Sequence, residues 1–399
     1  MPVEARTHAG PFLHTVSRPP DLASRDERSW LAERAPALMA GLASGTCGAV
    51  HLRGFETPRT PSGFRHFCAA LPLQACCDPL SSIGVRSLLS ASDGVYEAVD
   101  APSLADTHIG LHNDATFTLA APYACFVCFR KAASGGAFLV ADGRQVLRSL
   151  PPRLVDTLQR RKLRVRVAAL PVGMPLRVLP ARLQPPLRDL IASLARFGLV
   201  AALPKLRLDA AWSADGAMLQ VFEQPKPAVN VHPTSGAPSF FSGIDSQSAY
   251  LQRKRAEAAG GRTFEGVAST DVMWGDDGSP IETEVLEAIE EAVRASTVRL
   301  LMAPGDVVLL DTYTALHGRE SFNGPRQHAV QWLTHAAGEV GAYGDGVSGA
   351  SGDGGGTRLG GLINRLAVKG RGVPPRDAVD VNADSRSRRP SPEDRAPER

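Results

Sequence analysis

The chain has 399 residues, of which 43% are hydrophobic and 21% are charged, with a net charge of +3. This composition is ordinary for a globular enzyme with a sizeable core, and the small net charge without a basic stripe argues against nucleic acid as the main partner. The six cysteines lack regular spacing, which argues against a disulfide framework and favours a reduced, cytoplasmic protein. No uncharged apolar run reaches the roughly 18–20 residues that cross a bilayer, so we expect no membrane span.

The first predicted elements are two helices separated by a strand. Residues 1–26 show no periodic pattern and are predicted to be a flexible N-terminus. Apolar residues at helical spacing predict a helix from Ser29 to about Gly45, and a strand is expected over 48–55. A second helix is predicted over 64–71.

The next stretch, Gly110-Leu111-His112-Asn113-Asp114, has the pattern of a metal-binding strand. His112 and Asp114 are two residues apart, so on an extended strand both side chains leave the same face and can reach one cation. Another strand is predicted over 121–130. Within it Cys125 and Cys128 point to opposite faces, which favours packing cysteines over a metal or redox pair.

Two features follow this strand. Ser134-Gly135-Gly136-Ala137 predicts a turn where the backbone approaches another group closely. Residues 143–230 alternate helical stretches with proline-rich loops, an excursion of the kind that forms lids and substrate pockets.

The C-terminal third is predicted to hold a helix and three strands. Ser279 is expected to cap the helix, with Pro280 in its first turn and a buried stripe at Val285, Leu286, Ile289 and Val293. Strands are expected over 297–302 and 306–310. In the last strand, Arg326, His328, Val330 and Trp332 share one face. Residues 338–399 are rich in Gly, Ser, Asp, Arg and Pro and are predicted to be a disordered tail, which leaves 27–337 as one domain.

His317 is the best candidate for a third metal ligand, because it follows the apolar strand that ends at Asp311. Two histidines and one carboxylate with open positions form the facial arrangement of non-haem Fe(II) oxygenases. Either histidine alone is more often a structural residue. The order of His112, Asp114, the Gly-Gly turn, His317 and Arg326 favours the metal site.

These residues resemble the TauD/TfdA superfamily of Fe(II)/2-oxoglutarate dioxygenases. The resemblance rests on His-x-Asp at 112–114, on Gly135-Gly136, and on His317-Gly318-Arg319 with Arg326 nine residues after the histidine. The resemblance extends from about Gly48 to Thr334. Within the superfamily, the sequence is similar to the syringomycin-type (SyrP-like) aspartate hydroxylase branch. The fold it implies is mainly β with peripheral helices around a double-stranded β-helix, the jelly-roll of cupin-like proteins.

The resemblance also implies the cofactors and their ligands. Fe(II) would be held by His112, Asp114 and His317, while 2-oxoglutarate takes two of the open positions and O2 the third. The distal carboxylate of 2-oxoglutarate requires a fixed guanidinium, for which Arg326 is the first choice and Arg319 the second. A Thr commonly contacts the other carboxylate in this family, and this chain departs from the pattern with Phe138 at that position.

The activity implied is hydroxylation of an unactivated carbon of an amino acid, free or bound to a carrier protein, in antibiotic or other natural-product biosynthesis, with 2-oxoglutarate decarboxylated to succinate and CO2. Asp114 favours hydroxylation over halogenation, because related halogenases carry Gly or Ala there. Desaturation and ring formation stay open, as do the substrate and the oligomeric state. Two alternatives are a taurine- or aryloxyacid-type dioxygenase acting on a small anion, and a non-catalytic metal-binding barrel, which the departure at Phe138 favours.

Overall fold

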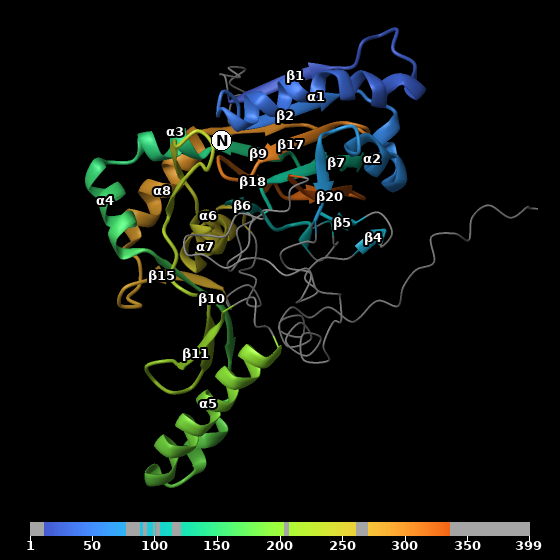
Figure 1. The fold of residues 1–399 in the computed structure, drawn as a ribbon. Helices are drawn as coiled ribbons and strands as arrows, with labels where there is room; N and C mark the ends of the chain where they lie inside the picture. Colours follow the sequence, from blue (N-terminus) through green and yellow to red (C-terminus); the bar gives the residue numbers. More distant parts are fainter. Residues whose placement is uncertain are drawn as a thin grey trace, which may run out of the picture.

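A computed structural model describes residues 12–76, 88–90, 94–98, 100, 104–113, 121–202, 207–260 and 270–335. The predicted tail over 338–399 and the metal-ligand candidate Asp114 lie outside these residues. Figure 1 shows two β-sheets with helices on their outer faces and an extended arm on one side. The mixture of sheets and helices agrees with the coarser part of the predicted fold class, strands with peripheral helices.

The larger sheet has eight strands within the described residues, in the order β1-β2-β17-β7-β20-β5-β4, with β3 also paired to β20. All neighbours are antiparallel except β1 and β2, which are parallel. The strands are β1 (Leu13–Ser17), β2 (Ala49–Arg53), β3 (Leu73–Ala75), β4 (Leu88–Ser90), β5 (Val95–Glu97), β7 (Tyr123–Arg130), β17 (Val307–Asp311) and β20 (Gln327–His335).

The smaller sheet faces the larger one and has the order β16-β9-β18-β6, all antiparallel. Its strands are β6 (Ile109–His112), β9 (Phe138–Asp142), β16 (Thr297–Leu300) and β18 (Ala315–Arg319). The two inner faces share one hydrophobic core, which includes Phe126, Val140, Leu310, Val330 and Trp332. The predicted alternation along the last strand is confirmed, because Val330 and Trp332 lie in this core while Ala329 and Leu333 lie in the core on the opposite face.

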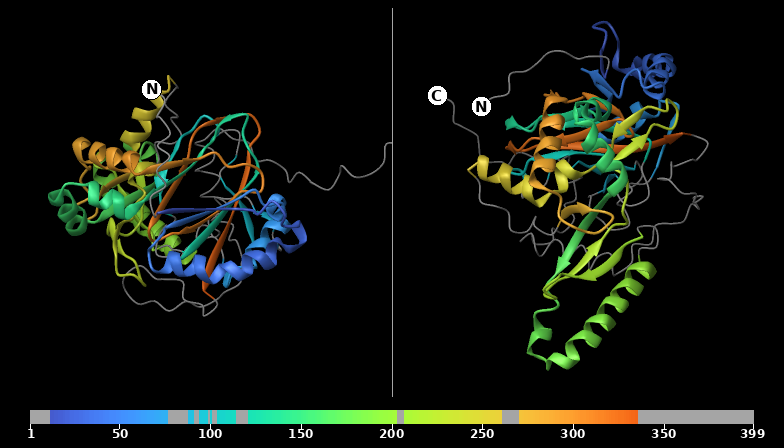
Figure 2. Two further views of the ribbon diagram at one scale, coloured as in Figure 1. Left: turned by 90° about the horizontal axis from the view of Figure 1, so that it is seen from above. Right: turned by 90° about the vertical axis from the view of Figure 1, so that its left-hand side faces the viewer.

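Helices α1 (Glu27–Ala43) and α2 (Pro61–Cys68) cover the outer face of the larger sheet (Figure 2). Their buried residues Leu31, Leu42 and Phe67 pack with alternate residues of β2, β7 and β17. Cys125 lies in this outer core and Cys128 in the inner one, both buried as free thiols. The prediction that these two cysteines pack on opposite faces is confirmed.

A second helical layer covers the smaller sheet and forms the third hydrophobic cluster, around the fully buried Trp274, Ile289 and Leu316. It contains α3 (Gly143–Ser149), α4 (Pro152–Arg161), α6 (Ile244–Gln247), α7 (Ala249–Ala258) and α8 (Thr283–Ala295), with the strand pair β13 (Val229–Val231) and β14 (Pro238–Phe240). A further short pair, β8 (Ser134–Gly135) and β19 (Phe322–Asn323), lies beside the site.

Residues 163–202 and 207–222 form the arm, which projects away from the two sheets in Figures 1 and 2. Its sheet has the order β11-β12-β10-β15, and α5 packs on it through Ala192 and Leu199. The elements are β10 (Leu163–Leu170), α5 (Gln184–Ala202), β11 (Asp209–Trp212), β12 (Leu219–Phe222) and, at the base, β15 (Asp271–Trp274), with 3-10 turns at Pro175–Val178 and Ala181–Leu183. The helical stretches and loops predicted over 143–230 did not include strands β11 and β12.

Two local predictions differ from the structure. The expected flexible N-terminus contains β1, since Phe12 and Leu13 are buried and the strand pairs with β2. The helix predicted to begin at Ser279 begins at Thr283, because the Ser279 carbonyl accepts the backbone N–H of Trp274 at 2.9 Å and extends the chain there. Glu282 stands at the N-cap and accepts a hydrogen bond from the Trp274 indole at 2.9 Å.

Candidate active site

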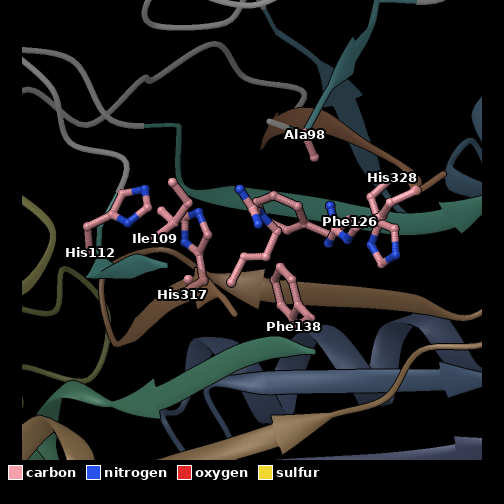
Figure 3. A pocket seen from close by; sticks show the side chains of 10 residues that line it. Ala98, Ile109, His112, Phe126, Phe138, His317 and His328 are labelled. Atoms are coloured by element: carbon pink, nitrogen blue, oxygen red, sulfur yellow. The ribbon is translucent and has the colours of Figure 1, made fainter. Parts of the chain in front are cut away.

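His112 and His317 come together because their strands pair. They are direct cross-strand partners on β6 and β18, and their ring centroids lie 4.5 Å apart. Neighbouring antiparallel residues place their side chains on the same face of a sheet. Two sequence positions about two hundred residues apart are thereby brought to one end of a cavity (Figure 3).

A backbone carbonyl determines which ring nitrogen of His112 carries the hydrogen. Its Nδ1 lies 2.9 Å from the Gly110 carbonyl oxygen, which can only accept a hydrogen bond, so Nδ1 carries the hydrogen. Nε2 is then the lone-pair atom of the ring. Metal-binding histidines usually donate their other ring N–H in this way, so His112 fits a metal ligand.

Two buried groups anchor the strand that carries His112. The Asn113 amide donates to the carbonyls of Thr312 and Ala315 at 3.0 and 3.1 Å, and its oxygen accepts the Ser242 N–H at 3.1 Å. On the other side, the Asp245 carboxylate accepts the Leu111 N–H at 2.7 Å. Asp245 is itself ion-paired with Arg255. These contacts fix β6 against both the β17–β18 turn and the helical layer.

The cavity beyond the histidines has an aromatic wall and a polar far end. Figure 3 shows His112 and His317 at one end, His328 at the other, and Phe126 with Phe138 between them. Phe138 is stacked on His317 with 6.1 Å between ring centroids and 16° between planes, and Phe126 lies 4.7 Å from the same ring. Phe138, at the position where the family commonly has a Thr, is therefore part of the buried hydrophobic wall of the cavity.

Arg319 and Arg326 line the same cavity and are both buried. Their guanidinium carbons lie 4.8 and 5.6 Å from the centroid of the Phe322 ring, in cation–π contact. Arg319 donates to the backbone carbonyls of Glu320 and Leu104 at 2.8 and 3.0 Å. Burial first, and then the neighbouring Arg326, lowers the pKa of Arg319 to about 10, so it stays charged at neutral pH.

The glycine turn predicted at 134–137 is confirmed as a place of close approach to this end of the site. Gly135 and Gly136 adopt φ of +66° and +69°, which side chains other than glycine rarely accept. A Cβ on Gly135 would lie 2.4 Å from the Ser321 carbonyl oxygen, and one on Gly136 would lie 3.4 Å from Arg326. The turn therefore packs directly against the segment that leads into β20.

Asp100 is the counter-ion that sequence reasoning missed. Its buried carboxylate pairs with the Arg326 guanidinium and accepts the backbone N–H of His328. Burial raises the pKa of Asp100 to about 6, although Arg326 opposes this shift. Asp245 was missed for the same reason, since neither acid stands in a recognisable motif and each meets its partner only in the fold.

The far end of the cavity carries more buried polar atoms and positive charge than the described residues satisfy. Within the described residues, Arg319 Nε, Arg326 Nε and His328 Nδ1 have no hydrogen-bond partner. Two guanidinium groups face one carboxylate, while burial holds the pKa of His328 well below its usual value and leaves it neutral. A buried site with spare donors and excess positive charge fits a bound carboxylate.

The family comparison agrees with this arrangement. A family model described as taurine catabolism dioxygenase TauD, TfdA family, matches residues 20–333. The chain belongs to the TauD/TfdA family. It is therefore an Fe(II)- and 2-oxoglutarate-dependent dioxygenase that uses O2, and the alternative of a non-catalytic barrel is set aside. A comparison with curated protein sequences gives no match.

Solved structures similar to this TauD/TfdA member share little sequence with it. PvcB from Pseudomonas aeruginosa is 15% identical with a TM-score of 0.46, covering 82% of this chain and 87% of that one. An asparagine oxygenase in complex with Fe(II), hydroxyasparagine and succinate is 15% identical with a TM-score of 0.46, covering 81% and 94%. AAD-2 in complex with Mn(II) and N-oxalylglycine is 12% identical with a TM-score of 0.42, covering 81% and 94%. We draw no conclusion about substrate from similarities of this size.

The described residues, which do not include Asp114, contain no cluster of three His, Cys, Asp or Glu placed to hold a metal ion. Among them, no helix combines the length and apolar character needed to cross a membrane.

Proposed function

We propose that this TauD/TfdA dioxygenase hydroxylates an unactivated carbon of an amino acid or a carrier-bound aminoacyl group. The observation that carries the oxygenase chemistry is the layout of one cavity, and the amino-acid substrate is proposed from the resemblance to the SyrP-like branch. Two facing histidines stand at one end of it, and two buried arginines with unused N–H donors stand at the other. A cosubstrate with two carboxylates matches both ends.

His112, Asp114 and His317 are proposed to hold the iron, with Asp114 assigned from its spacing to His112. Iron and 2-oxoglutarate together supply the oxidising chemistry when bound. The protein contributes orientation, because the Gly110 carbonyl sets the tautomer of His112 and strand pairing sets the position of His317. Phe126 and Phe138 surround His317 with apolar groups that exclude water.

Arg326 is proposed to bind the distal carboxylate of 2-oxoglutarate, with Arg319 as the second choice. Both lie in the same cavity, but Arg319 already donates through Nη1 and Nη2 to backbone carbonyls. Arg326 donates to Asp100, a side chain that can be displaced. With Phe138 offering no hydroxyl, the other carboxylate must rely on the metal and on other donors.

The finer assignments rest on the sequence. We propose a double-stranded β-helix, formed by the two facing sheets, within a catalytic domain of residues 27–337. The arm then lies within the predicted 143–230 insertion. The resemblance to the SyrP-like branch favours an amino-acid substrate in natural-product biosynthesis, and the irregularly spaced cysteines favour a cytoplasmic location. The second buried arginine favours one further candidate, a small anionic substrate such as a sulfonate or an aryloxy acid.

Succinate formation from 2-oxoglutarate tests this proposal. The Fe(II)-loaded enzyme is incubated with O2 and with panels of free amino acids, aminoacyl thioesters on carrier protein, sulfonates and aryloxy acids. We expect stimulation above the uncoupled background by an amino-acid panel, with a hydroxylated product by mass spectrometry, and loss of both with His317→Ala. Stimulation by a small anion alone would assign the second candidate. No stimulation by any panel would refute both substrate classes.

A further inference from the structure

The contact between Asp100 and Arg326 has a consequence for cosubstrate binding. Asp100 and Arg326 are both buried, and their pairing occupies Nη1 of the guanidinium. The other Asp100 oxygen accepts the His328 N–H, so the carboxylate is held on two sides. A carboxylate held in this way has the chemistry of the ligand that Arg326 is proposed to bind.

We propose that Asp100 is a built-in competitor that occupies Arg326 in the free enzyme and must be displaced by the distal carboxylate of 2-oxoglutarate. This inference rests on the proposed role of Arg326. Asp100 thereby sets the cosubstrate affinity, because each binding event exchanges one buried ion pair for another.

The charge balance around the pair supports exchange over simultaneous binding. If Asp100 stayed in place, a second carboxylate on the same Arg326 guanidinium would meet a like charge, and Glu97 on β5 adds a further negative charge close to Asp100. When Asp100 leaves, the incoming carboxylate can accept hydrogen bonds from Arg326 Nη1 and from Arg326 Nε. The Nε atom has no partner among the described residues.

A purely structural Asp100 predicts the opposite result. If its role is to orient Arg326 for the ligand, removing its charge will weaken 2-oxoglutarate binding. If it competes, removing the charge will strengthen binding. The direction of the change in affinity therefore separates the two roles.

The test is anaerobic titration of the Fe(II)-loaded full-length protein with 2-oxoglutarate for the wild type and four variants. We expect Asp100→Asn to bind about 10-fold or more tightly, as expected for release of a charge-assisted hydrogen bond. Asp100→Glu keeps the charge and should not gain affinity. Asp106→Asn, which removes an exposed carboxylate six residues further along the chain, should bind like the wild type. Arg326→Ala should lose binding.

Thermal unfolding provides a second readout if Asp100→Asn is destabilised by its unpaired arginine. Saturating 2-oxoglutarate should then raise the melting temperature of Asp100→Asn more than that of the wild type. Unchanged or weaker binding by Asp100→Asn, with Arg326→Ala still defective, would overturn the competitor role and leave the proposed function intact. Normal binding by Arg326→Ala would instead refute the assignment of Arg326.

An independent observation concerns the surface of the arm. Ten large hydrophobic side chains are exposed within the described residues, and eight of them lie between 172 and 200. They are Val172, Met174, Val178, Leu183, Leu190, Leu194, Phe197 and Val200. Large groups of exposed apolar side chains mark interaction surfaces in soluble proteins more often than chance would give.

We infer that the outer face of α5 pairs with the same face of a second copy of the chain, with the two helices antiparallel. Leu190, Leu194 and Phe197 recur at spacings of four and three residues and form one stripe. The opposite face of α5 is already used, since Ala192 and Leu199 pack on the arm sheet. No element among the described residues packs on the stripe, whose three side chains are 54%, 60% and 73% exposed.

The charged residues beside the stripe indicate that its partner is a second copy of the chain and that the two helices run antiparallel. Asp189 and Arg196 are exposed on one edge of the stripe, seven residues apart. In an antiparallel pair related by a two-fold axis, this edge of one helix faces the same edge of the other, so Asp189 meets Arg196 of the second copy. In a parallel two-fold pair this edge would face the opposite edge of the other helix, so Asp189 and Arg196 would not meet.

Both Asp189 and Arg196 have polar atoms left to form this contact. Arg196 uses Nε toward Asp209 at 3.0 Å, which leaves its outer nitrogens for a partner. Asp209 is also paired with Arg164 at 3.0 Å, so replacing Arg196 does not leave it unpaired. Asp189 forms no ion pair with any residue that the structure describes.

Sedimentation of the full-length protein over a range of concentrations tests the pairing. We expect a dimer for the wild type, a monomer for Phe197→Asp, and at least a 10-fold weaker dimer for Asp189→Arg. The double variant Asp189→Arg with Arg196→Asp should restore the dimer. Leu301→Asp, at a side chain that is 72% exposed outside the arm, should not alter assembly.

A monomeric wild type at every concentration, or a charge-swapped double variant that stays monomeric, would overturn this inference. So would a monomer that binds vesicles of mixed anionic lipid through Phe197, since the stripe would then face a lipid surface. All variants are expected to keep wild-type 2-oxoglutarate affinity, which separates this test from those on the active site.

Discussion

At the scale of single residues, the cavity combines an imbalance of charge with fixed histidine geometry. Arg319 and Arg326 contribute two positive charges, and Asp100 contributes one negative charge within reach of Arg326. Burying an unbalanced charge costs free energy, so such a site persists where a ligand supplies the missing charge. The 2-oxoglutarate carboxylate has this role in our account.

The two arginines are predicted to differ in their effect on cosubstrate binding. Arg326→Ala should weaken 2-oxoglutarate binding roughly 100-fold or more, because it removes a buried charge-assisted pair worth about 2–5 kcal/mol. Arg319→Ala should weaken it less, since its Nη donors serve the backbone. Isothermal titration without O2 measures both, and an equal loss in the two variants would contradict the assignment.

Cosubstrate affinity is predicted to depend on pH through Asp100. Burial raises the pKa of Asp100 to about 6, against the effect of Arg326 and in the same direction as Glu97. As pH falls through 6, Asp100 takes up a proton and releases Arg326, so wild-type binding should tighten. His328 stays neutral in this range, because burial lowers its pKa. The ratio of dissociation constants between wild type and Asp100→Asn should fall toward one at pH 5.5, and a constant ratio would contradict this.

Of the residues at the site, those that stand in a sequence motif could be predicted from sequence alone. His112, His317, Arg319, Arg326 and Phe138 stand at motif positions, and the structure places them around one cavity. Asp100 could not be predicted, because it stands 226 residues from Arg326 in a stretch without a pattern. An acid of this kind acquires its role only from the strand pairing that brings it to an arginine.

At the scale of elements, the presence of a buried strand was easier to predict than the residues at which elements begin and end. The apolar runs that became β2, β7 and β17 were evident from composition, since buried strands need nearly continuous hydrophobic residues. The start of α8 was misplaced because a tertiary contact of Ser279 with Trp274 outweighs its capping tendency. Strands β11 and β12 of the arm were missed because each is only four residues long.

Asn113 is predicted to hold β6 in place. Asn113→Ala leaves the Thr312 and Ala315 carbonyls and the Ser242 N–H without their partner, at about 1–3 kcal/mol for a buried unsatisfied group. We expect lower stability in urea and weaker Fe(II) binding at His112. Asn230→Ala, which removes a local bond to the Val231 N–H, is the matched control. Unchanged stability and iron affinity for Asn113→Ala would refute this anchoring role.

At the scale of the whole molecule, the larger sheet connects two hydrophobic cores. Alternate residues of β7, β17 and β20 face the outer helices and the smaller sheet, so loss of packing on one face is felt on the other. Trp332 is fully buried between the sheets and makes an edge contact with Phe126, whose ring lines the cavity. Stability and site geometry therefore depend on the same core.

Trp332→Ala is predicted to lower the free energy of unfolding by about 3–5 kcal/mol, as for other large-to-small changes in a packed core. It should also weaken 2-oxoglutarate binding, because Phe126 loses its support. Leu301→Ala, at an exposed side chain, should change stability by no more than about 0.5 kcal/mol. Denaturant unfolding followed by ligand titration measures both effects, and a destabilised variant with wild-type affinity would argue against a shared core.

The most direct test of the account is anaerobic titration of the Fe(II)-loaded protein with 2-oxoglutarate, followed by the weak visible charge-transfer band expected of the bound chelate in this family. We predict that the band appears for the wild type, is lost in His112→Ala and is weakened in Arg326→Ala. Iron binding without a band would contradict the assignment of this cavity as the 2-oxoglutarate site.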